Sequence, residues 1–147
     1  MRLRFACSVA QPNPGDVKIQ ELKDDTCGPD LSGSFSFTLE NGDKVLRIRE
    51  TTPVLTHRTW YTVRNTGDWA NVAPFEVHYL VQVGDASNDR FVLFNDLTFI
   101  NSGVPTINAP DDDRREISGD RNILFNDLTV ANAKIPSLNN VPKPTGH

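Results

Sequence analysis

The sequence predicts an all-β protein folded as an antiparallel β-sandwich. Apolar and polar residues alternate along most of the chain, which is the period of half-buried strands, and no segment longer than a turn or two shows helical periodicity. The length of 147 residues fits one ordinary domain. We therefore expect a single sandwich domain over residues 1–140 and a flexible tail over residues 141–147, where prolines and a glycine gather.

The composition argues against two classes of protein. Fifteen Lys and Arg residues against nineteen Asp and Glu residues give a formal net charge of −4. A duplex-binding protein, by contrast, usually presents a basic face to the phosphates. No stretch approaches the roughly 20 apolar residues that cross a bilayer. We expect neither a nucleic-acid partner nor a membrane span.

The chain begins with two arginines and a short apolar run, an arrangement that imitates a secretory leader. Because this run has only about six residues and Pro12 and Pro14 follow closely, we expect a first strand instead. Cys7 and Cys27 are too few for a disulfide scaffold. They form either one bridge in an oxidising compartment or two free thiols, and the sequence leaves both open.

The clearest local prediction is a hairpin over residues 34–49. Asn41-Gly42 is the dipeptide that best tolerates positive φ at both central positions of a type I′ turn. With this dipeptide at the tip, two cross-strand apolar pairs share one face: Phe37 with Leu46, and Phe35 with Ile48. Turn chemistry and hydrophobic pattern therefore agree on one register.

The next two strands are expected over residues 55–65 and 75–83. The first is rich in β-branched and aromatic residues, and the second alternates strictly. In the second strand one face carries Phe75, Val77, Tyr79, Val81 and Val83, and the other carries Glu76, His78 and Gln82. Leu80 adds apolar weight to the polar face, which favours a strand inside a sheet.

The last third of the chain contains an internal repeat. Residues 90–98 return 31 positions later as residues 121–129, and the hexapeptide Leu-Phe-Asn-Asp-Leu-Thr is identical in both copies. Because a solenoid needs three or more units, we interpret the repeat as a duplicated strand with a bend. The polar steps Asn95-Asp96 and Asn126-Asp127 indicate a bulge inside each of these strands.

The segment from Trp60 to Asp68, followed by Ala73 to Val77, resembles the Ig-like modules of bacterial surface proteins, notably the adhesion-related CARDB-like family. The shared pattern is an alternating strand, Asn-x-Gly, a few small residues and Pro-Phe before another strand. The two Asp-Leu-Thr tripeptides also look like openings of such modules, although their order along the chain departs from the usual one. The resemblance implies an Ig-like sandwich with a non-catalytic binding or spacer role.

Candidate metal ligands gather in two loops. Asp85, Asn88 and Asp89 lie in the first loop, and the acidic run over residues 111–113 lies in the second. Loops at the end of a sandwich bind calcium through such oxygens, although Asp and Asn are also the usual turn formers. The spacing does not match an EF-hand. Calcium held by Asp85, Asn88 and Asp89 is the one cofactor that we consider.

No set of residues is spaced for catalysis. The sequence contains no motif typical of an activated nucleophile, a phosphate-binding loop or a zinc protease. His57 and His78 would share a metal if their strands were neighbours, but we find no Cys or carboxylate at ligand spacing beside either. We therefore expect a protein that is not an enzyme.

Trp69 lies in a polar loop, where an exposed indole can stack on a ligand or anchor a partner. Alternatively, it folds down as a plug over the edge of the sandwich. We expect Trp69 and the two Asn-Asp steps, Asn95-Asp96 and Asn126-Asp127, to contact a partner protein or to mediate self-association.

These features favour a non-catalytic module for protein contact or assembly, located outside the cell, at a cell surface or on a virion. Two other hypotheses stay open. One is a phage or virus structural protein, such as a decoration or tail protein. The other is a carbohydrate-binding module or small glycosidase, whose ligand would be a glycan.

Overall fold

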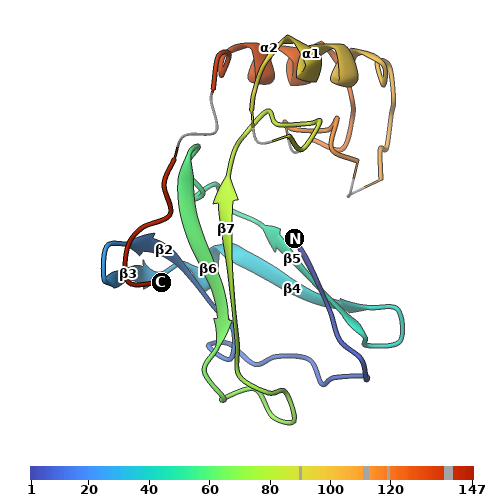
Figure 1. Cartoon of the computed structure of the whole chain (residues 1–147). Helices are drawn as coiled ribbons and strands as arrows, with labels where there is room; N and C mark the ends of the chain where they lie inside the picture. The colour runs from blue at the N-terminus through green and yellow to red at the C-terminus, as the bar shows by residue number, and fades with distance from the viewer. Residues whose placement is uncertain (90, 111–112, 119, 138–140) are drawn as a thin grey trace. The chain divides into compact units, whose positions relative to one another are not determined.

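The computed structural model describes residues 1–89, 91–110, 113–118, 120–137 and 141–147 (Figure 1). They form two compact units. The sandwich unit consists of Met1–Val81 with Lys143–His147, and the helical unit consists of Gln82–Pro142. The prediction of one sandwich over residues 1–140 is therefore wrong, because the strands end at Val81 and a second unit is inserted before the last five residues.

The sandwich unit contains two antiparallel sheets, which confirms the predicted fold class. One sheet has three strands in the order β1-β5-β4, and the other has four in the order β3-β2-β6-β7. The strands are β1 (Arg2–Arg4), β2 (Lys18–Lys23), β3 (Thr26–Asp30), β4 (Phe35–Glu40), β5 (Val45–Glu50), β6 (Thr59–Asn65) and β7 (Phe75–Val81), with a 3₁₀ turn at Ser32–Ser34. The expected first strand is thus present as β1.

The core of this unit is formed by the apolar faces of both sheets. Alternate residues of each strand point inward, so a few β-branched and aliphatic side chains from each sheet meet in the middle. The buried cluster comprises Val17, Ile19, Leu46, Ile48, Val63 and Trp69. Phenylalanines of β4 and aromatic residues of β7 pack around it.

The β4–β5 hairpin keeps the predicted faces but not the predicted register. Phe37 lies opposite Ile48, and Phe35 lies opposite Glu50, a shift of two residues. The loop has four residues, and Asn41, Gly42 and Asp43 all have positive φ there. Because side chains alternate with a period of two, a two-residue shift leaves the same side chains on the core face.

β7 is an edge strand, contrary to the prediction that it lies inside a sheet. Its alternation is as predicted, because Phe75 and Tyr79 pack against the core. Val77, on the same face, is 37 % exposed.

Cys7 and Cys27 are free thiols.

The segment Lys143–His147 is not a loose tail. The Asp25 N–H donates to the Thr145 carbonyl at 3.0 Å, and the Thr145 N–H donates to Asp24 Oδ1 at 2.9 Å. The His147 ring nitrogen Nε2 lies 2.9 Å from the Lys23 carbonyl oxygen. We call residues 143–147 the closing segment, because they attach to the turn between β2 and β3 after the inserted unit.

The helical unit contains α1 (Phe94–Asn101) and α2 (Phe125–Asn132), which contact each other side by side (Figure 1). The prediction of strands over residues 90–98 and 121–129 is therefore wrong. Among the described residues of these two segments, only Val92 and Ile123, just before the helices, make β-bridges. Arg90 lies outside the described residues. The Asn-Asp step is the first turn of a helix in each copy and not a bulge.

The two copies are related by an approximate two-fold symmetry. Val92 of the first copy bridges Ser137 after the second helix, and Ile123 of the second copy bridges Thr106 after the first helix. Exchange of residue i with residue i+31 converts one bridge into the other. The repeat is thus a single compact pair in which each copy completes the other, around a buried cluster of Ala86, Ile100, Ala109, Ile123 and Ala131.

Candidate partner-binding face of the helical unit

Asp96 and Asp127 cap the two helices. Asp96 Oδ2 accepts the Leu93 N–H at 2.8 Å, and its Oδ1 accepts the Ser87 N–H at 2.9 Å. Asp127 bonds Leu124 and Ser118 in the same way. A carboxylate at this position satisfies free N–H groups and complements the helix dipole. Both residues are 0 % exposed, so the prediction that they contact a partner is wrong.

Asn95 and Asn126 are exposed and lie at the start of the helices. Asn95 Nδ2 donates to Asp89 Oδ2 at 2.9 Å, and Asn126 Nδ2 donates to Asp120 Oδ2 at 2.8 Å. Each amide thus ties a helix to the loop before it. Their predicted role as partner contacts stays a prediction, and they lie at the border of the face described below.

The predicted calcium ligands Asp85 and Asp89 lie in one tight loop. The Asp89 N–H donates to Asp85 Oδ1 at 3.1 Å, and the Phe91 N–H donates to Asp89 Oδ1 at 2.9 Å. The bond from Phe91, and after it that from Asn95, lowers the pKa of Asp89. Asn88 has a φ of 62°, as expected for a turn former.

Sequence reasoning missed how far the repeat extends upstream. Glu116, Ser118 and Asp120 stand 31 positions after Asp85, Ser87 and Asp89, and they repeat the same loop: the Asp120 N–H donates to Glu116 Oε1, and the Asn122 N–H donates to Asp120 Oδ1. Asp120 also has a lowered pKa, chiefly because of the Asn122 N–H. The signal in the sequence was the same series before each hexapeptide: an acidic residue, a serine and an aspartate, each two positions apart.

Of the acidic run at 111–113, Asp111 and Asp112 lie outside the described residues, and Asp113 forms an ion pair with Arg115 at 2.7 Å.

The exposed side chains of the two helices are themselves uncharged, although the Arg115 guanidinium lies 5.8 Å from the centre of the Phe99 ring of α1. All residues of α1 and α2 are described, and their only ionisable side chains are the buried Asp96 and Asp127. At the first helical position of each copy, Phe94 and Phe125 are each 72 % exposed. Exposed helix positions usually carry charged side chains. We call this surface of α1 and α2 the aromatic face.

A groove of about 580 Å³ runs between the helices on this side. Its lining comes from both copies and consists of small polar and aliphatic side chains with one aromatic ring: Leu97, Thr98, Asn101, Phe125, Leu128, Thr129 and Asn132. The amides and hydroxyls offer neutral hydrogen bonds beside apolar surface. Enrichment in aromatic residues and depletion of charged residues are typical of the core of a protein–protein interface.

Trp69 does not lie on any surface. It is 2 % exposed and belongs to the core of the sandwich unit. Its Nε1–H donates to the Ala10 carbonyl at 2.9 Å, and its ring meets Phe5 edge to face at 5.4 Å between centroids. The plug alternative is therefore confirmed, and Trp69 as a contact for a glycan or a partner is wrong.

Comparisons with protein-family models, with curated proteins and with solved structures returned no match. The resemblance to Ig-like surface modules is therefore still a prediction. Among the described residues, no helix is both long enough and apolar enough to span a bilayer.

Proposed function

We propose that this chain is a non-catalytic module that binds another protein through the aromatic face of its helical unit. The observation that carries the proposal is the pair Phe94 and Phe125, both 72 % exposed at equivalent positions. Burying such a ring contributes about 2–3 kcal/mol, and exposed aromatic pairs of this kind are typical anchors of interfaces. The resemblance to Ig-like modules of surface proteins supports the same class of function, at a cell surface.

The charge of the helical unit indicates the kind of partner. Residues 82–142 contain nine acidic and five basic residues, so this unit carries the whole net charge of −4. A second copy meeting the same face would bring two negatively charged units together, which costs free energy. The partner is therefore a different protein, with an apolar patch for the two rings and a basic rim.

The first test compares Phe94→Ser and Phe125→Ser with Ile107→Ser. Ile107 is 64 % exposed in the same unit but outside the helices, so it is a matched control. A partner isolated with the wild-type chain is purified and titrated by calorimetry against each variant. We expect each phenylalanine variant to weaken binding by about tenfold or more, equivalent to about 1.4 kcal/mol, and the control to bind normally.

Two results would contradict the proposal. One is a partner that binds the Phe94→Ser and Phe125→Ser variants as tightly as the wild type. The other is sedimentation that shows a dimer which only these two substitutions dissociate, because the face would then belong to a second copy.

A second function, calcium binding in the duplicated loops, is favoured by the positions of the oxygen donors. Contrary to the sequence-based statement that the spacing does not match an EF-hand, it matches one in part. Asp85, Ser87, Asp89 and Asp96 take positions 1, 3, 5 and 12 of a twelve-residue loop, from which helix–loop–helix calcium sites draw their ligands. Arg90 replaces the usual glycine at position 6, and Leu93 removes the ligand at position 9. Three carboxylates, a hydroxyl and a carbonyl still fit Ca²⁺, with fewer donors than a complete loop.

Calorimetric titration with CaCl₂ tests this second function. We expect binding that is lost in Asp89→Asn/Asp120→Asn, because one carboxylate leaves each loop. Asp43→Asn, in the exposed β4–β5 turn, is the control for charge alone. Equal heats for the wild type and the double variant would refute calcium binding at these loops and would leave the aromatic face untouched.

A further inference from the structure

Three potential metal ligands meet on the sandwich unit. Glu76 and His78 lie on β7, and His147 lies in the closing segment. Their ligand atoms all lie within 4.8 Å of one another. His78 Nε2 is 2.5 Å from Glu76 Oε1, and the two imidazole rings are 5.8 Å apart at 85°.

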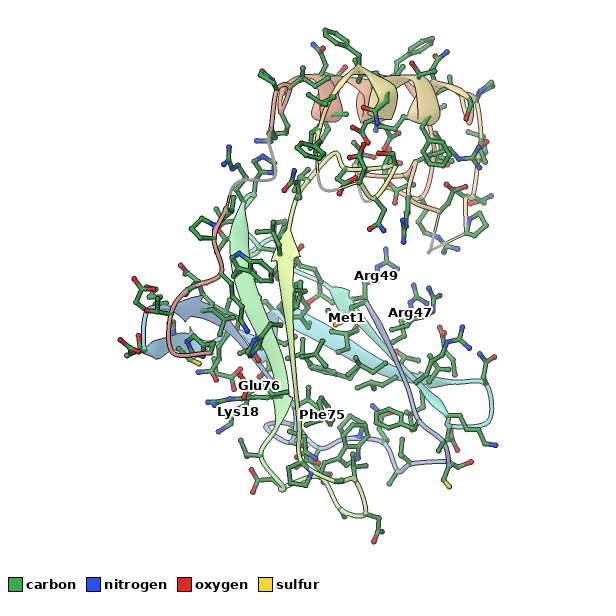
Figure 2. The ribbon with its side chains drawn as sticks, in the orientation of Figure 1. Met1, Lys18, Arg47, Arg49, Phe75 and Glu76 are labelled. Carbon is green, nitrogen blue, oxygen red and sulfur yellow. The ribbon has the colours of Figure 1, made fainter. Side chains whose placement is uncertain are left out.

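The β7 residues share a face because of the strand period. Residues 76 and 78 are two apart and therefore point to the same side of the four-stranded sheet, away from Phe75 and Tyr79. Figure 2 shows Glu76 and Lys18 of this sheet, which belong to one cross-strand row with Arg64 between them. The closing segment brings His147 to this outer side.

The hydrogen bonds of His147 suit a ligand. Its Nε2 lies 2.9 Å from the Lys23 carbonyl oxygen and 3.1 Å from the Thr26 carbonyl oxygen. Two carbonyls can only accept, so Nε2 carries the proton and Nδ1 keeps a lone pair. A backbone carbonyl behind the far ring nitrogen is the usual support of a metal-bound histidine.

The charge of Glu76 suits a cation as well. Glutamate side chains ordinarily have a pKa of about 4.3, so a carboxylate ligand carries a negative charge near neutral pH. Sequence reasoning overlooked this residue as a ligand beside His78 and paired His78 with His57 instead.

We propose that Glu76, His78 and His147 form a site for a divalent transition metal, with Zn²⁺ as its best-suited occupant, and that the metal fastens the closing segment to β7. Two imidazoles and one carboxylate are a zinc donor set that leaves a fourth position for water. In a tetrahedral site with ligand atoms about 2.1 Å from zinc, these atoms lie about 3.4 Å apart. A separation of up to 4.8 Å between the ligand atoms therefore has to close by up to about 1.4 Å, which is within reach of side-chain rotation at the exposed Glu76 and His147.

The site joins two parts of the chain that are separated by the whole helical unit. Glu76 and His78 precede that insertion, and His147 follows it. Binding of the metal adds a cross-link on the sandwich unit and stabilises the docked closing segment. We expect zinc to slow amide exchange at Asp25 and Thr145, whose N–H groups bond across this contact.

The test uses the full chain without an affinity tag, at pH about 7.5, where most histidines are neutral. Co²⁺ is titrated first because its visible absorption reports bound imidazole and carboxylate, and Zn²⁺ then displaces it. The variants are Glu76→Gln, His78→Gln and His147→Gln, with His57→Gln as the matched control. We expect one metal site per chain. The metal affinity of His78→Gln and of His147→Gln should fall by more than the roughly 10–100-fold that is typical when a ligand loses its outer hydrogen bond.

His147 is exposed, so His147→Gln tests the site without risk to the fold. The proposal is overturned if His147→Gln binds Co²⁺ like the wild type, if His57→Gln loses binding to the same extent, or if no metal binds. It is also overturned if zinc binds but leaves exchange at Asp25 and Thr145 unchanged, because the closing segment would then not be held by the metal.

Discussion

Replacement of Trp69 by phenylalanine measures how much the plug contributes to the sandwich unit. Phenylalanine keeps a ring against Phe5 and removes the donor to the Ala10 carbonyl. The lost hydrogen bond costs about 1 kcal/mol. Loss of the indole's second ring removes roughly 40 Å² of buried apolar surface, which costs about 1 kcal/mol of unfolding free energy. The cavity that the ring leaves behind adds to this cost. We expect a total loss of about 2–3 kcal/mol in the free energy of unfolding.

The assay is urea unfolding followed by far-ultraviolet circular dichroism, with the midpoint converted through the slope of the transition. For a unit of this size about 1 kcal/mol corresponds to a melting shift of roughly 4–8 °C, so the thermal transition falls by roughly 8–24 °C. Trp60→Phe, in β6, is the control for loss of an indole at a half-buried position. If Trp69→Phe costs no more than Trp60→Phe, Trp69 does not act as a core residue.

Two further predictions concern one residue in each unit: Tyr79 in the sandwich unit and Gly84 in the helical unit. Burial, and after it the charges of Tyr61 and Glu50, raises the pKa of Tyr79. A raised pKa means stability that is complete below the ordinary value of about 10 and declines above it. The urea midpoint of the wild type should therefore fall as the pH rises from about 9 to about 11, a range centred on the ordinary tyrosine pKa. The urea midpoint of Tyr79→Phe should fall less over the same range. Gly84 has a φ of +95°, and an added Cβ would lie 2.9 Å from Val92 Cγ1. Gly84→Ala should thus destabilise the helical unit by about 1–3 kcal/mol by the same assay, whereas Gly33→Ala, with open space around it, should be nearly neutral.

The sandwich could be predicted because its strands follow the period of two closely. Phe35, Phe37, Leu46 and Ile48 face the core as the alternation requires. The register of their hairpin could not, because Asn41-Gly42 fits both a two-residue turn and the four-residue loop that forms. Asp43, which also adopts positive φ, decides between them, and this preference is too weak to read from one residue.

The helices could not be predicted from periodicity. Each has eight residues, and two of its inward positions are an aspartate and an aliphatic or small residue: Asp96 with Ile100, and Asp127 with Ala131. A buried carboxylate in the first turn breaks the apolar stripe on which helix recognition depends. Phe94, by contrast, extends an apolar run in the sequence and is nevertheless exposed.

Part of the candidate site was nevertheless visible in the sequence. The duplicated hexapeptide marks the place where the aromatic face lies, and self-association or partner binding was expected of it. The error was in the residues: the Asn-Asp step carries the cap and the loop contact, while the phenylalanine before it is exposed. Tertiary packing alone distinguishes these roles.

The insertion of the helical unit has a mechanical consequence. On the proposed function, a pulling load on the aromatic face reaches the sandwich unit through two connections of the chain, one to β7 and one to the closing segment. β7 is paired with β6 over seven residues, whereas the closing segment is held by a few bonds at the β2–β3 turn. We therefore expect the closing segment to detach from the sandwich unit at a lower load than β7.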